Sequence, residues 1–245
     1  MDIAVVKYLV LVSVTLLASV VTLLTSFGVG TILLPAMTFF FDIKVAVFLV
    51  AIVHFFNNLS RVLIYRSAVD WSVIRRFGVI SLIGAFLGSY LQMVLYSNWL
   101  KAGVGLFLAV YGLWQLAPHS PRLKLPQSLD VAGGFFSGLL GGLIGNQGAI
   151  RSLYLLNYKL EKEELIASAA LIAVIIDATR IPVYAVSMHS YLEDNALLVA
   201  VVVATAILGT KLGGRLLPKV SAEGFKRLVL AAVTVIGVLM LAGVV

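Results

Sequence analysis

The stretch NLSRVLIY at residues 58–65 recurs as DATRIPVY at residues 177–184, at an offset of 119 positions. Both copies begin with Asn or Asp, have a hydroxyl residue third and Arg fourth, and end with Tyr. They lie at matching points of two halves that have the same order of apolar segments. We therefore interpret the chain as a duplication, with a first repeat at 1–117, a linker at 118–128 and a second repeat at 129–245.

The composition is that of a membrane protein. Of the 245 residues, 61% are hydrophobic and 12% are charged, and the mean hydropathy is +1.08. A soluble domain is roughly 45–50% apolar and about 25% charged, so this chain cannot cover itself with a soluble surface. Cysteine is absent, which excludes a disulfide framework and a thiolate metal site. We expect an all-α integral membrane protein.

Each repeat opens with an apolar element that is interrupted by glycine and polar residues. The interruptions are at 26–31 and 145–148. The first is followed by a short apolar stretch at 32–41, and the second by a short segment at 149–158. Ten helical residues rise about 15 Å, half the thickness of the hydrocarbon core. We expect a broken or re-entrant helical element in each repeat, although the segment at 3–25 is long enough to cross completely.

Three longer apolar segments follow each broken element and are expected to be transmembrane helices. They lie at 44–66, 72–96, 102–117, 164–186, 195–217 and 225–245.

Basic residues indicate how these segments are oriented. The loops at 66–76, 118–128, 158–164 and 211–227 hold twelve Lys and Arg residues, against three on the opposite side. Cytoplasmic loops are enriched in basic residues, so we place these loops, including the linker, in the cytoplasm. The net charge of +7 then reflects this bias, and we expect no nucleic-acid partner. The two broken elements would enter from opposite faces, which makes the repeats inverted, as in many secondary transporters.

The two interruptions are the first candidate binding site. A helix N-terminus has unpaired N–H groups and partial positive charge, which favour anions. Within a membrane such groups must lie inside protein or line a cavity. The candidate substrate-binding residues are Gly28, Val29, Gly30 and Thr31 in the first interruption, and Asn146, Gln147 and Gly148 in the second. For any single glycine, tight helix packing is the alternative explanation.

Arg151 is the sharpest candidate among the charged residues. It follows Gly148 by three positions, in the first turn of the expected half-helix. A guanidinium group matches the geometry of oxyanions, and a charge within a membrane usually has a function or a partner. The alternatives are that Arg151 reaches the cytoplasmic surface or pairs with Asp177.

Further polar side chains lie inside apolar segments. Arg180 is three residues from Asp177, so an ion pair within the helix competes with a substrate contact. A histidine near the middle of a span could carry a proton at physiological pH, or could be a packing residue. The remaining candidates are Arg61, Asn57 and Asn58 for substrate binding, and His54 with Asp177 for proton coupling or an ion pair. For Arg61 the alternative is that its side chain reaches the membrane surface, and for the two asparagines it is hydrogen bonding between helices.

Several enzyme classes lack their motifs. The chain has no Gly-x-x-x-x-Gly-Lys-Ser/Thr loop, no His-Glu-x-x-His pair and no Gly-x-Ser-x-Gly elbow. We therefore expect no enzyme activity, no cofactor and no bound metal.

Two stretches resemble the sulfite exporter TauE/SafE family: GVGTILLP at residues 28–35 and GGFFSGLLGGLIGNQG at residues 133–148. The resemblance covers nearly the whole chain. It implies duplicated halves that each open with a Gly-rich break, and a carrier of small sulfur-containing or organic anions in a bacterial-type inner membrane, often an exporter. The family's usual run of three glycines is altered in both breaks, and Arg151 stands where the family has an apolar or Pro-flanked position.

We therefore expect a secondary transporter of a small oxyanion such as sulfite or a short sulfonate, working by alternating access between the repeats. Its partners would be the anionic substrate and membrane lipids, and its oligomeric state is left open. An anion channel lined by the same groups is one alternative. An intramembrane enzyme acting on a lipid-linked anion is another, with His54 and Asp177 as the acid/base pair.

Overall fold

A computed structural model describes residues 3–24, 29–95, 97–117, 126–155, 158, 160–216 and 222–243. All regular secondary structure in these ranges is helical. Six of the described helical segments are long and apolar enough to cross a membrane. The chain is therefore an all-α membrane protein, as its composition predicts.

Both halves contain a short helix after an interruption, followed by longer helices. The first half contains α1 (Ile3–Leu24), α2 (Val29–Thr38), α3 (Ile43–Ile64), α4 (Trp71–Val73), a π-helical turn (Ile74–Gly78), α5 (Val79–Val94) and α6 (Ser97–Leu116). The second half contains α7 (Asp130–Ile144), α8 (Gly148–Leu155), α9 (Lys162–Asp194), α10 (Ala196–Leu216) and α11 (Ala222–Leu241).

Short helices follow both interruptions, as expected, but their bounds differ from the expected 32–41 and 149–158. Helix α2 has 10 residues and spans Val29–Thr38, so Val29, Gly30 and Thr31 are helical rather than part of the interruption, and α8 has 8 residues and spans Gly148–Leu155. The first broken element is the longer one, because α1 has 22 residues and α7 has 15. At 1.5 Å per residue these lengths are about 33 Å and 22 Å. Of these two helices, only α1 is therefore long enough to cross the hydrocarbon core. The two broken elements thus differ in length, as the long apolar segment at 3–25 suggests.

The end of α9 differs from expectation, and most of the linker lies outside the described residues. Helix α9 continues to Asp194 rather than ending at Val186. Hydropathy marks where a helix leaves lipid, and a polar stretch such as 187–194 can continue the helix beyond that point. Of the linker, residues 118–125 lie outside the described ranges, and Gln127–Leu129 forms a 3-10 turn.

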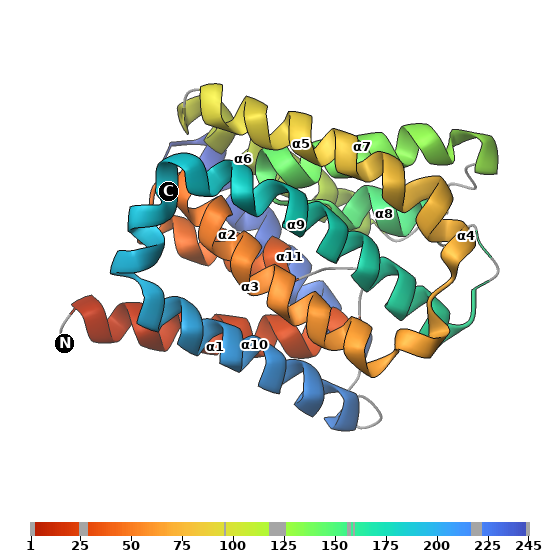
Figure 1. Cartoon of the computed structure of the whole chain (residues 1–245). Helices are drawn as coiled ribbons and strands as arrows, with labels where there is room; N and C mark the ends of the chain where they lie inside the picture. The colour runs from red at the N-terminus through yellow and green to blue at the C-terminus, as the bar shows by residue number, and fades with distance from the viewer. Residues whose placement is uncertain are drawn as a thin grey trace.

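Helices pack mainly against partners from the other half of the chain. In Figure 1, α1 lies beside α10 on one side of the bundle, α5 beside α7 on the other, and α3 beside α9 between them. Helix α6 packs against α11. The central position of α3 explains its sequence, because residues 45–53 are apolar on every face and all are buried.

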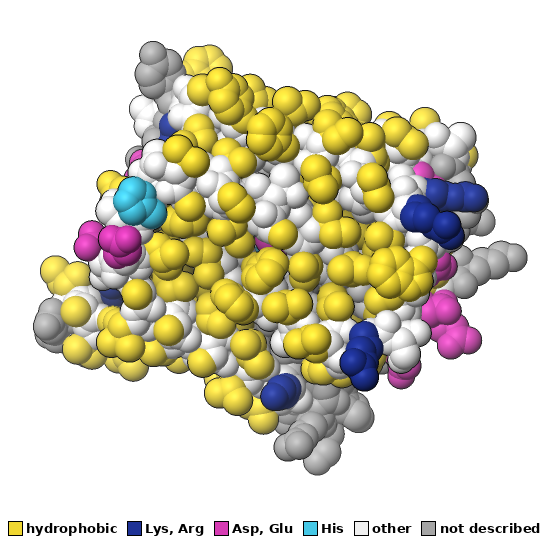
Figure 2. All heavy atoms as spheres, in the orientation of Figure 1, with side chains coloured by type: hydrophobic (Ala, Val, Ile, Leu, Met, Phe, Trp, Pro, Cys, Tyr) yellow, Lys and Arg dark blue, Asp and Glu magenta, His cyan; other side chains and the backbone are white. Residues whose placement is uncertain are grey.

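The outer surface is suited to lipid. Figure 2 shows a broad hydrophobic band between two charged ends. Large apolar side chains such as Phe86, Val186 and Leu197 are exposed on the bundle. Exposed apolar surface on this scale is stable when lipid tails replace water around it.

Polar contacts lie at both ends of the bundle. At one end, Lys7 Nζ donates to Asn195 Oδ1 at 3.2 Å. At the other end, the Tyr158 hydroxyl donates to Asp130. Partial burial, together with this bond, raises the pKa of Tyr158, so the phenol remains a donor at neutral pH. The end that holds Tyr158 is the one predicted to face the cytoplasm.

Glycines allow α5 and α7 to approach until their backbones touch. A Cβ atom built on Gly138 would overlap the carbonyl oxygen of Ser81, and one on Gly84 would overlap that of Phe135. Small residues at crossing points are typical of membrane helix packing. For these glycines, the packing explanation is therefore the one that the structure supports.

Candidate anion-binding site

The first turn of α2 and the turn after α7 meet inside the bundle. A Cβ atom on Gly30, at the start of α2, would lie 3.3 Å from the carbonyl oxygen of Gly145. Beside it, the Thr31 hydroxyl lies 3.3 Å from Asn146 Oδ1 and donates to it. Gly145 has φ of 77° and ends α7 in the left-handed conformation, which glycine adopts without strain. Elements from the two halves, more than one hundred residues apart in sequence, are thus in contact.

The turn after Gly145 directs the chain into α8. The Ser137 hydroxyl donates to the carbonyl oxygen of Gln147 at 3.1 Å and fixes the turn against α7. Asn146, Gln147 and Gly148 are all buried. The first amides of α8, like those of α2, have no partner within their own helix. Two helix N-termini with partial positive charge therefore begin in the protein interior.

Arg151 points into the protein and not toward the membrane surface. Its side chain is 6% exposed, and its Nε and Nη1 atoms have no hydrogen-bond partner among the described residues. It lies close enough to Asp177 for attraction and to Arg61 for repulsion. Unpartnered N–H groups on a buried guanidinium are costly, and an anion that accepts from them would remove that cost.

Arg180 is committed to a structural network. It is fully buried, with Nε at 2.9 Å and Nη2 at 2.8 Å from Asp177 Oδ1. Its Nη1 donates to the carbonyl oxygen of Gly141 at 2.8 Å, and the Tyr184 hydroxyl donates to that of Gly142. Side chains of α9 thus hold the C-terminal end of α7, where the Gly141 carbonyl oxygen also accepts from the Gly145 N–H at 3.1 Å.

Sequence reasoning did not single out Tyr184 or the two glycine carbonyls. Tyr184 could have been found, because it is the last residue of the repeated octapeptide. The carbonyl acceptors could not have been found, because every residue has a backbone carbonyl. Only the register between α7 and α9 determines which carbonyls accept a hydrogen bond.

His54 and Asp177 lie in direct contact. His54 Nδ1 is 2.6 Å from Asp177 Oδ2. Gln147 Nε2 lies 3.4 Å from the same histidine nitrogen and 3.5 Å from Asp177 Oδ1. The ring also lies close to the start of α2, because a Cβ on Gly30 would lie 3.6 Å from His54 Cδ2. These two residues, from matched segments of α3 and α9, are therefore beside both breaks.

Arg61 and Asn58 continue the cluster along α3. Arg61 Nη2 donates to the carbonyl oxygen of Thr22 at 3.1 Å, and its Nη1 lies 3.5 Å from Asn58 Oδ1. Asn58 Nδ2 donates to the backbone of His54 at 2.8 Å. Arg61 Nε has no described partner, so this guanidinium is only partly satisfied.

Three of the sequence candidates lie elsewhere or outside the described ranges. Asn57 donates to Thr210 Oγ1 at 2.7 Å and to the carbonyl oxygen of Ala206 at 3.0 Å, so it joins α3 to α10. Val29 is buried in the apolar core. Gly28 lies outside the described residues.

The cluster has an excess of positive charge. Arg61, Arg151 and Arg180 stand against the single carboxylate of Asp177, which leaves two uncompensated positive charges when His54 is neutral. Among the described residues, no group of three His, Cys, Asp or Glu side chains could hold a metal. The chemistry of this site fits a small anion.

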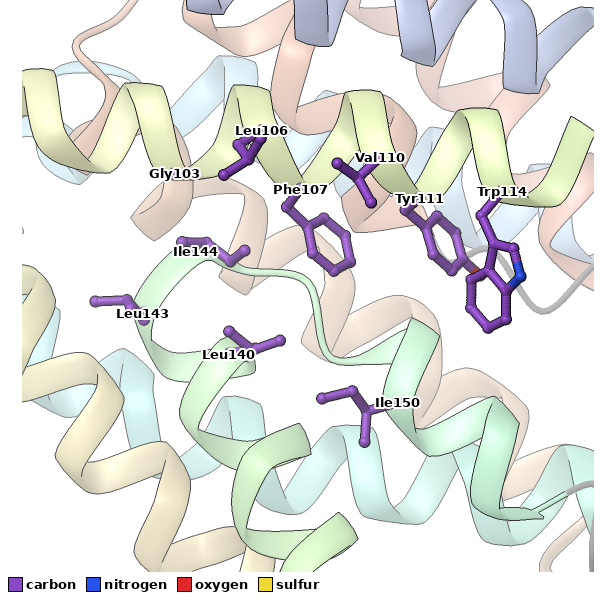
Figure 3. Close-up of a pocket in the computed structure, with 10 residues that line it drawn as sticks. All are labelled: Gly103, Leu106, Phe107, Val110, Tyr111, Trp114, Leu140, Leu143, Ile144 and Ile150. Carbon is purple, nitrogen blue, oxygen red and sulfur yellow. The ribbon is translucent and has the colours of Figure 1, made fainter. Parts of the chain in front are cut away.

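A separate pocket of about 460 Å³ lies on the other side of the second break. Figure 3 shows Phe107, Tyr111 and Trp114 of α6 facing Leu140 and Ile150 across it. Its lining is almost entirely apolar. It cannot compensate a negative charge, so the arginine cluster is the better place for an anion.

Comparison with curated proteins and with solved structures found no match. The family model described as sulfite exporter TauE/SafE matches residues 11–240, nearly the whole chain. The apolar helices and the matched family agree on a multi-pass membrane protein, and the family is consistent with a bacterial inner membrane. The chain belongs to the sulfite exporter TauE/SafE family.

Proposed function

We propose that this protein is a secondary transporter that exports a small sulfur-containing or organic oxyanion, such as sulfite or a short sulfonate. The family is one of membrane exporters of sulfite and related anions. The observation that carries the proposal for this chain is Arg151, a buried guanidinium in the first turn of α8 whose Nε and Nη1 atoms have no hydrogen-bond partner among the described residues.

The anion would lie between residues 28–31 and 146–151. The unpartnered N–H groups of Arg151 Nε and Nη1 would each donate to an oxygen of the anion, and backbone amides at the start of α8 would complete the shell. Asp177 does not neutralise Arg151 fully, because its oxygens are in contact with Arg180 and His54. The remaining positive charge is available to the substrate.

The pairing of helices supports alternating access between inverted repeats. Exchanging the two halves converts the α1–α10 pair into α7–α5 and leaves the α3–α9 and α6–α11 pairs unchanged. This is the pattern expected when two equivalent units are related by an approximate two-fold axis, as in transporters that rock one repeat against the other. Our candidate side chains among the described residues are at most 9% exposed, which suits an occluded state.

The test is uptake of radiolabelled sulfite into proteoliposomes by purified wild-type protein and by Arg151→Ala. Losing a hydrogen bond to a charged group costs about 1.5–3 kcal/mol, so we expect transport efficiency to fall about 10- to 100-fold. Arg151→Lys keeps the positive charge but lacks the guanidinium group, so its transport efficiency should fall less than that of Arg151→Ala. The matched control is Arg75→Ala, which removes an exposed arginine. Unchanged flux and affinity in Arg151→Ala would contradict the proposal.

The same vesicles distinguish a transporter from a channel. Unlabelled sulfite inside the vesicles should accelerate entry of labelled sulfite, because an alternating-access site exchanges its substrate. A pore shows no such acceleration and does not saturate at low rates. That result would favour the channel alternative.

A further inference from the structure

A buried histidine connects the two parts of the proposed anion site. His54 lies near the middle of α3 and is 4% exposed. Its ring is close to Gly30 of the first break and to Gln147 of the second. A change of charge on this ring would therefore act on both segments that are proposed to hold the substrate.

The geometry allows His54 to gain a proton without losing its partner. An ionised carboxylate only accepts hydrogen bonds, so His54 Nδ1 must carry the hydrogen that it shares with Asp177 Oδ2 at 2.6 Å. A second proton would go to Nε2. The imidazolium would keep the same bond to Asp177 and strengthen it, because bonds between opposite charges are stronger than neutral ones.

Protonation of His54 would change the charge that the anion meets. The surrounding charged groups are Asp177 and Arg180 on α9, Arg151 on α8 and Arg61 on α3. One more positive charge raises their excess from two to three. Charges act strongly on one another in a dry interior, so an anion would bind more tightly to the protonated site.

Few further titratable residues lie on the elements packed against α3. Tyr184 on α9 donates its hydroxyl to the carbonyl oxygen of Gly142, and the 3-10 turn Arg66–Ala68 contributes Arg66. Helix α2 has no titratable side chain. Helix α10 has Lys211 and Arg215 in its last two turns, and α6 has Lys101 near its start. Tyr111, further along α6, has a hydrogen bond with Gln115.

We infer that His54 is the proton-binding site of this transporter, and that binding of a proton there and binding of the anion strengthen each other. The inference rests on the proposed function. Thermodynamic linkage makes the effect reciprocal: if the proton strengthens anion binding, the anion strengthens proton binding by the same factor.

The experiment measures protons taken up per sulfite bound, by calorimetry at pH 7 in two buffers with different ionisation enthalpies. Wild-type protein is compared with His54→Gln and with His189→Gln, which replaces an exposed histidine near the end of α9. Sulfite itself titrates near this pH, but its contribution is common to all three proteins and cancels in the difference. We expect His54→Gln to take up fewer protons than wild type, by up to about one, and His189→Gln to match wild type.

Equal proton uptake by wild type and His54→Gln would overturn the inference and leave the proposed function intact. Failure of wild-type protein to bind sulfite would contradict the proposed function itself. If His54→Gln does not fold, the nitrogen resonances of ¹⁵N-histidine-labelled wild-type protein give the answer, since the chain has only three histidines. Sulfite should shift the His54 resonances toward the protonated form, and unchanged resonances would overturn the inference.

Discussion

Asp177 accepts contacts from side chains on three elements of the fold. Arg180 is on the same helix, His54 is on α3, and Gln147 lies in the turn before α8. The carboxylate is fully buried. At the residue scale, its charge is therefore what fixes the positions of a guanidinium and an imidazole beside the breaks.

Asp177→Asn should destabilise the protein strongly. It leaves Arg180 buried without a counter-charge, and removing one member of a buried ion pair costs about 3–5 kcal/mol. We expect a clear drop in the midpoint of thermal unfolding in detergent. The double variant Asp177→Leu with Arg180→Met removes both charges and should recover most of the loss. If Asp177→Asn has the same midpoint of thermal unfolding as wild type, the ion pair does not hold the cluster together.

At the scale of helices, α7 combines two uses of glycine. Gly138 faces α5, where a side chain would meet the backbone of Ser81. Gly145 ends the helix with a positive φ and lets the chain turn toward α8. The first use holds the broken element in the bundle, and the second creates its interruption.

Gly138→Ala should force α5 and α7 apart. Overpacking of a tight contact typically costs about 1–3 kcal/mol, so we expect a lower midpoint of thermal unfolding. Gly103→Ala on α6 is the matched control, because a Cβ there meets nothing within 4 Å. It should be neutral or slightly stabilising, since alanine favours helix by about 1 kcal/mol over glycine. Equal stability of the two variants would mean that close α5–α7 contact is unimportant.

Much of the helical layout can be predicted from sequence, because lipid imposes a simple rule on hydropathy. The break at 145–148 and the half-helix after it follow from glycine and polar residues between apolar runs. The end of α9 does not follow, since the stretch 187–194 is polar yet still helical. Hydropathy reports contact with lipid, whereas helix ends depend on backbone hydrogen bonds.

At the scale of the whole molecule, the chain is built from pairs of helices that come from different halves. The repeated octapeptide predicts that α3 and α9 are equivalent, but it does not predict their register. The contact between His54 and Asp177 depends on that register, so sequence alone leaves it open. The nearness of the two breaks has the same origin, because only the packed bundle brings Gly30 to Gly145.

The central claim is that a negative charge binds between the two breaks beside Arg151. Crystals grown with selenite, a pyramidal analogue of sulfite, would locate the anion through the anomalous scattering of selenium. We predict a peak within about 4 Å of the Arg151 guanidinium, the usual range of an ion pair, and between residues 28–31 and 146–151. Peaks found only at surface lysines and arginines, with the interior site lacking selenium, would contradict the account.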